Sequence, residues 1–124
     1  MIDFKNATLA KLRPVSDESF GKMVNPLLTN DENIVATFRG LRDGVVITDK
    51  RLIIIDVQGV VGKMRDFSSL PYRNIQAFTV RTAGVFDIDS ELDLWFSGLG
   101  NVILEFSGKV DISAVCRVIS AYIL

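Results

Sequence analysis

The sequence contains no histidine among its 124 residues. This absence excludes Ser-His-Asp and Cys-His catalysis, imidazole acid–base chemistry and zinc sites built around histidine. Cysteine occurs once, as Cys116, so the chain can form neither an internal disulfide nor a CxxC redox pair. We therefore predict a protein that is not an enzyme and that carries no catalytic residue, no cofactor and no metal.

A strong net charge and a long apolar run are also lacking. The 14 basic and 15 acidic residues give a net charge of −1, which argues against a nucleic-acid partner. No apolar run approaches the roughly 18 residues of a membrane span, and the first ten residues lack the apolar centre of a secretory signal. A cytoplasmic protein is expected, with membrane contact at most weak and peripheral.

What is abundant is apolar sequence, at 48% of residues, and this predicts a folded core in one domain of ordinary size. Residues 1–13 have a weak helical pattern. A second helix is predicted to begin at the N-cap Ser16 and to end near Val24, because a proline follows two residues later. Leu27 and Leu28 would then form a turn directed at the core.

From residue 34 to residue 106 the pattern changes to short apolar runs separated by Gly, Asp, Asn or Pro, as in an all-β sandwich or barrel. Short connections between the runs favour antiparallel neighbours. The seven strands predicted are Asn33–Arg39, Gly44–Thr48, Arg51–Val57, Lys63–Ser68, Asn74–Val80, Glu91–Ser97 and Asn101–Phe106.

A final helix is predicted to begin at the N-cap Asp111 and to run to the end of the chain. Its core-facing row consists of Ile112, Val115, Cys116, Ile119, Tyr122 and Ile123, whereas Ala114, Val118 and Ala121 lie on an apolar flank away from that row. The predicted organisation is a single domain with an N-terminal helical extension over residues 1–30, a barrel over 31–107 and a capping helix over 111–124.

Three segments resemble the bacterial pleckstrin-homology domain family. They are LRDGVVITDKRLIIIDVQGVVGK at 41–63, LPYRNI at 70–75 and TAGVFDIDSELDLWFSG at 82–98. The resemblance implies a PH-like barrel of seven antiparallel strands in two nearly orthogonal sheets, capped by the C-terminal helix, and a ring-shaped homo-oligomer. An acidic residue precedes the Thr-Ala-Gly word in the family, whereas this chain has Arg81.

The acidic run Asp87, Asp89, Glu91 and Asp93 has the spacing that begins a calcium-binding loop. The glycine and the glutamate that this template needs at its sixth and twelfth positions are replaced by leucine and glycine. A solvated strand edge is therefore the preferred interpretation of the run, ahead of a metal site.

Basic residues flank the first hairpin, where the ligand loops of the fold would lie. Arg39, Arg42 and Lys63 are the candidates for binding an anion, and they support an alternative function as a peripheral binder of anionic lipid or phosphoinositide. The sequence has no polybasic block there, so ordinary solubilising charges are the competing interpretation.

Self-assembly is predicted from strand parity, because each strand of a one-core barrel should bury one face only. Val35, Trp95 and Ile103 oppose the apolar faces of their strands and are candidates for an oligomer interface. Residues 39–81 carry 8 basic and 4 acidic side chains, whereas 82–124 carry 2 and 6, so the halves differ as +4 and −4. This split favours head-to-tail contact between identical subunits.

Together these features predict a non-enzymatic binding or scaffold module. It would form a ring-shaped homo-oligomer, for which the family resemblance suggests a pentamer, and would present its surfaces to an unidentified protein partner. Isolated exposed apolar residues are common on soluble proteins, so the alternative that the three interface candidates have no partner stays open.

Overall fold

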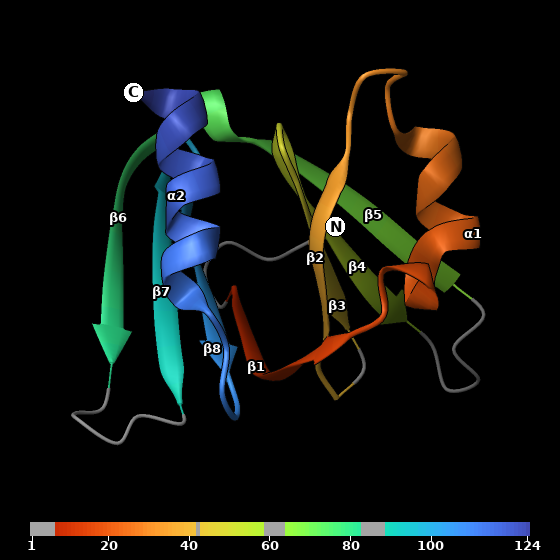
Figure 1. The fold of residues 1–124 in the computed structure, drawn as a ribbon, viewed down its shortest axis with the longest axis horizontal. Coiled ribbons are helices and arrows are strands. Elements are labelled where there is room, and N and C mark those ends of the chain that lie inside the picture. Colours follow the sequence, from red (N-terminus) through yellow and green to blue (C-terminus); the bar gives the residue numbers. More distant parts are fainter. Residues whose placement is uncertain (1–6, 42, 59–63, 83–88) are drawn as a thin grey trace.

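The computed structural model describes residues 7–41, 43–58, 64–82 and 89–124, and it shows a mainly β fold with a C-terminal helix (Figure 1). The eight described strands are β1 Thr8–Val15, β2 Ile34–Arg39, β3 Gly44–Thr48, β4 Arg51–Gln58, β5 Met64–Pro71, β6 Ile75–Thr82, β7 Ser90–Phe96 and β8 Gly100–Phe106. The helices are α1, Gly21–Val24, which lies between the 3₁₀ turns Asp17–Phe20 and Asn25–Leu27, and α2, Ile112–Ile123; a third 3₁₀ turn covers Tyr72–Asn74.

The strands form one mixed sheet in the order β5-β4-β3-β2-β1-β8-β7-β6. Two antiparallel groups, β2–β5 and β6–β8, are joined through β1. The end of β1, Arg13–Val15, pairs antiparallel with β2, and its beginning pairs parallel with β8. The pairing with β8 is irregular between Leu9 and Leu12, where Lys11 has a φ of 56° that is unusual for a residue other than glycine, and the change of partner follows Leu12. Figure 1 shows β1 bending between the two groups, which cross at an angle.

The helix predicted over residues 1–13 is wrong from residue 8 onward, because Thr8–Val15 is a strand at the centre of the sheet, and residues 1–6 lie outside the described residues. Leu9 and Leu12 of this strand are both buried. Hydrogen-bonded neighbours on both sides of β1 outweigh a weak local preference. The expectation of seven strands, all antiparallel, is wrong for the same reason: β1 is an additional strand, and its pairing with β8 is parallel. The seven strands that were predicted are all present, with ends shifted by up to three residues.

The main core lies between the two groups of strands, and α2 packs against it (Figure 1). Asp111 caps this helix as predicted, since its Oδ1 accepts a hydrogen bond from the backbone N–H of Ala114 at 3.1 Å. Val118 packs against the core although it was assigned to the outer flank, whereas Tyr122, assigned to the core row, is exposed. Cys116 is partly buried against the core, and burial raises the pKa of its thiol.

A second apolar cluster lies on the opposite face of β3 and β4. Its buried members are Phe20, Val24, Val46, Ile53 and Ile55. The helical segment between β1 and β2 therefore covers the outer face of the β2–β5 group. Ser16 caps this segment as predicted, accepting a hydrogen bond from the backbone N–H of Glu18 at 3.2 Å.

The turn that follows α1 matches its prediction in part. Leu28 packs against the second cluster, whereas Leu27 is exposed. Within the ranges that the structure describes, no helix combines the length and the apolar character that crossing a bilayer requires.

Candidate functional site

The Thr48–Leu52 turn of the family-like segment is the most densely bonded polar part of the described chain. Arg51 Nε and Nη2 donate to the two carboxylate oxygens of Glu32 at 2.9 and 2.8 Å, and Thr48 Oγ1 donates to the same carboxylate at 2.6 Å. Arg51 Nη2 also donates to the carbonyl oxygen of Leu27 at 2.6 Å, and Nη1 donates to Ser69 Oγ at 3.0 Å. The turn therefore ties β4 to β5 and to the end of the helical segment.

The Glu32 side chain in this junction is only 1% exposed. Burial raises the pKa of its carboxyl, but hydrogen bonds from Arg51, Thr48 and the Thr29 backbone lower it by more, so the net shift is downward. The carboxylate is thus a paired structural charge. Arg51 thus pairs with Glu32, which lies outside the turn, and Asp49 accepts hydrogen bonds from Asn33.

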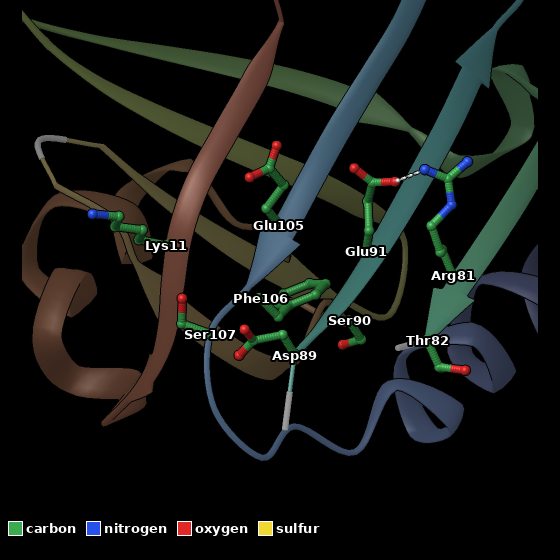
Figure 2. A pocket seen from close by; sticks show the side chains of 9 residues that line it. All are labelled: Lys11, Arg81, Thr82, Asp89, Ser90, Glu91, Glu105, Phe106 and Ser107. Carbon is green, nitrogen blue, oxygen red and sulfur yellow. Dashed lines mark ion pairs between the residues drawn. The ribbon is translucent and has the colours of Figure 1, made fainter. Parts of the chain in front are cut away.

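A pocket of about 450 Å³ lies where β6 ends, β7 begins and β8 ends, beside the bend of β1 (Figure 2). It is lined by Lys11, Arg81, Thr82, Asp89, Ser90, Glu91, Glu105, Phe106 and Ser107. Strand pairing brings these residues together, because Arg81 lies opposite Glu91 and Glu91 lies opposite Glu105.

The pocket combines opposite charges. Arg81 Nη1 lies 3.4 Å from Glu91 Oε2, the ion pair drawn in Figure 2. Glu105 forms no ion pair with any side chain in the described part of the sequence. The hydroxyl oxygen of Ser90 is buried and has no hydrogen-bond partner among the described residues. This lining offers hydrogen bonds to a polar molecule, but it contains no nucleophile held by an adjacent base.

The acidic run predicted to be a solvated edge contributes two residues, Asp89 and Glu91, to this pocket. Asp89 Oδ1 accepts from the backbone N–H of Gly108 at 3.0 Å, and Asp93 Oδ1 accepts from Asn101 Nδ2 at 2.9 Å. Asp87 lies outside the described residues. Among the residues that are described, no three His, Cys, Asp or Glu side chains are placed to hold a metal ion.

Of the three anion-binding candidates, Arg42 and Lys63 lie outside the described residues. Arg39 is exposed, and its guanidinium lies over the Phe20 ring, 4.8 Å from the ring centroid. Its cross-strand neighbour on β1 is Arg13, a basic residue that the analysis of the sequence did not select because a helix was expected there. Arg13 is therefore a further candidate for binding an anion beside Arg39. The stacking of Arg39 on Phe20, however, already gives this guanidinium a role within the fold.

Two of the three interface candidates lie together. Trp95 on β7 and Ile103 on β8 share the outer face of the β6–β8 group, where Trp95 is opposite Asn101 and Ile103 is opposite Asp93. Trp95 is 46% exposed, and Ile103 is partly buried. Val35 is exposed on β2, in the other group of strands.

Leu99, in the turn that joins β7 to β8, is also exposed, and the sequence analysis missed it. Its position in a short turn between two recognised strands was the available signal. With Leu99, the β7–β8 hairpin carries three apolar side chains outside the main core.

Comparison with known proteins agrees with this architecture. The sequence pattern described as the bacterial PH domain matches residues 3–123. The uncharacterized protein YjqA of Bacillus subtilis is 38% identical over 120 residues, covering 95% of this chain and 96% of its own length. YozO, a second uncharacterized protein of Bacillus subtilis, is 30% identical over 109 residues, which is 88% of this chain and 94% of its own length.

The fold is also similar to solved structures. A crystal structure of a DUF1696 family protein with a pleckstrin-homology domain from Shewanella loihica superposes with a TM-score of 0.78 at 35% identity, covering 93% of this chain and 99% of that one. The pleckstrin homology domain of Shewanella amazonensis gives a TM-score of 0.62 at 38% identity, over 89% and 92% of the two chains. The matched pattern extends over nearly the whole sequence, and the shared architecture supports the match, so the chain belongs to the bacterial PH domain family.

Proposed function

We propose that this protein is a non-enzymatic binding or scaffold module that assembles with copies of itself into a ring. The observation that carries the proposal is the exposed Trp95 on the outer face of β7, with Ile103 beside it on β8. A large aromatic side chain and a β-branched one on a sheet face are typical of a surface that another protein covers.

The distribution of these side chains favours head-to-tail contact. A ring with identical heterologous contacts needs two different surfaces on each subunit. Val35 lies on β2, and β1 and β8 separate that strand from β7, so it offers an apolar surface apart from the one around Trp95. The basic middle and the acidic end of the sequence supply opposite charges for the same arrangement. In this proposal the assembled ring presents repeated surfaces to a further protein, and contact with anionic membrane is at most weak.

Light scattering coupled to size-exclusion chromatography tests the assembly. At tens of micromolar, the protein is expected to show a mass several times its 13.7 kDa, with a pentamer as the specific expectation. Trp95→Glu should shift the mass toward the monomer, because a buried unpaired charge at the contact is costly. Leu41→Glu, which changes an apolar residue of the β2–β3 turn that is 74% exposed, is the control for adding a charge at an exposed apolar position and should leave the mass unchanged.

Intrinsic fluorescence gives a second reading, because Trp95 is the only tryptophan of the sequence. Dilution that dissociates the assembly should move its emission to longer wavelength as the indole becomes hydrated. A monomeric mass for the unmodified protein at tens of micromolar would refute the assembly. An unchanged assembly in folded Trp95→Glu would refute only the assignment of this face.

A further inference from the structure

Strands β5 and β6 are the two edges of the described sheet, and they are protected to different degrees. Strand β5 carries the charged residues Arg65 and Asp66 and ends in Pro71, which has no backbone N–H to donate. Such charges and prolines are the usual means by which proteins discourage another strand from pairing with an edge.

Strand β6 has few of these protections. Its sequence, IQAFTVRT, contains no proline and a single charged residue, Arg81, near its end. A register shift occurs at its beginning, but Ala77–Thr82 pair with β7 in unbroken register. Six residues of regular strand therefore present alternate backbone N–H and C=O groups on a side where no described strand pairs with them.

On the inner face of β6, the apolar side chains are not covered on the side away from β7. Leu104, Leu92 and Val80 form one cross-strand row on the inner face of β8, β7 and β6. Leu104 and Leu92 are 0% exposed, whereas Val80 is 40% exposed. In the next row Phe78 is only partly buried, although its partner Leu94 is fully buried. One more strand beside β6 would place side chains next to Val80 and Phe78 and remove their apolar surface from water.

We propose that β6 binds an extended peptide segment of another protein as an added strand. The backbone groups of Ala77–Thr82 would supply hydrogen bonds that do not depend on sequence. Val80 and Phe78 would select aliphatic side chains at alternate positions of the peptide. Trp95 lies opposite Ala77 on the neighbouring strand β7, but the backbone groups proposed to bind are those on the side of β6 away from β7, so the inference does not rest on self-assembly. Peptide binding is expected to persist in Trp95→Glu.

The probe is a phage-displayed library of random twelve-residue peptides, with the full-length protein as bait. We expect enriched sequences with aliphatic residues at every second position. An enriched peptide, synthesised alone, should slow hydrogen exchange of the Ala77–Thr82 amides. Val80→Lys should weaken its binding at least about tenfold, because the inward-facing ammonium would replace the apolar contact. Met64→Lys places the same charge on an exposed apolar residue of the β5 edge, and it should leave binding unchanged.

Backbone pairing has a sharper test. In a strand, the N–H groups of alternate residues point to the same side. Two versions of the peptide, N-methylated on the two alternate sets of residues, should therefore differ: one loses at least about tenfold in affinity and the other binds as before. Equal effects of the two versions, no enrichment over a library panned without bait, or unchanged exchange in β6 would each overturn the proposal. Slow exchange of Ala77–Thr82 in the assembled protein alone, lost on dilution to the monomer, would assign the edge to a second copy and would also overturn it.

Discussion

On strands β3 and β4, the outward-facing side chains of Val46 and Ile53 are as buried as those that face the main core, whereas the outward-facing Trp95 of β7 is 46% exposed. The same violation of strand parity therefore has two different causes in one sheet. In the β2–β5 group the chain covers its own outer face with Phe20 and Val24. In the β6–β8 group no described segment does so. A strand that is apolar on both faces therefore predicts that something packs on its outer face. The pattern does not tell whether that is another segment of the same chain or another molecule.

Chain order explains the difference. The covering segment follows β1 and precedes β2, so it begins and ends beside the group of strands that it covers. The β7–β8 connection, Ser97–Leu99, is too short to fold back over its own hairpin. Helix α2, the longest helix among the described residues, packs against the inner core.

The largest expected effect comes from removing the anchor of the covering segment. Arg51→Ala leaves the Glu32 carboxylate buried without its charge partner and frees the carbonyl of Leu27. Breaking a buried ion pair on one side costs about 3–5 kcal/mol, so the free energy of unfolding measured in urea should fall by this order. Hydrogen exchange should also quicken in α1.

Lys50→Ala is the matched control, because Lys50 neighbours Arg51 and pairs with the exposed Asp31 at 2.7 Å. An exposed ion pair contributes little, so the urea midpoint should not change measurably. Equal losses in the two variants would contradict the structural role given to the buried junction.

The next effect compares the two outer faces directly. Phe20→Ala removes a ring that packs on Gly44, where an added Cβ would lie 2.6 Å from the ring carbons, and on the buried cluster. It should cost about 3 kcal/mol of unfolding free energy. Trp95→Ala, measured at concentrations where the protein is monomeric, should cost less than Phe20→Ala, because 46% of Trp95 is exposed and no described segment packs over its outer side, whereas Phe20 is buried. A large loss at Trp95 in the monomer would show that the two faces are alike.

Much of the fold follows from local patterns. Seven strands and the capped helix Ile112–Ile123 were predictable because short apolar runs, turn residues and an N-cap specify them within a few neighbours in sequence. Strand β1 was not, since its central place depends on pairing with β8, which follows it by more than eighty residues. Its bend at Lys11, with positive φ, has no residue signal such as glycine.

The sites were less predictable. The pocket is lined by side chains from the ends of β6, β7 and β8 and by Lys11 of β1. The sequence predicted the first three strands but not β1, so it could not predict the pocket. The partner of Arg51 was also missed, because Glu32 precedes the first predicted strand and nothing in the sequence marks it as buried. Strand parity alone predicted that Trp95 and Ile103 lie on the face away from the core, because that prediction needs only the strand assignment; their role at an interface stays a prediction.

The smallest expected effect is the pH dependence of the free energy of unfolding that Glu32 causes, at the junction between the β2–β5 group and the helical segment that covers it. Hydrogen bonds from Arg51 and Thr48 outweigh burial and hold the pKa of Glu32 in the folded protein below its ordinary 4.5. The carboxylate therefore stabilises the fold fully above about pH 4.5, and this contribution is lost as the pH falls through the lower, folded-state pKa. Burial raises the pKa of Asp43, so that residue acts in the opposite direction, and a matched variant is needed to separate the two. Glu32→Gln keeps an acceptor for Arg51 but removes the titration. Between pH 6 and pH 3, the free energy of unfolding measured in urea should fall less steeply for Glu32→Gln than for the unmodified protein. An equally steep fall in both proteins would show that Glu32 is not the acid-sensitive group.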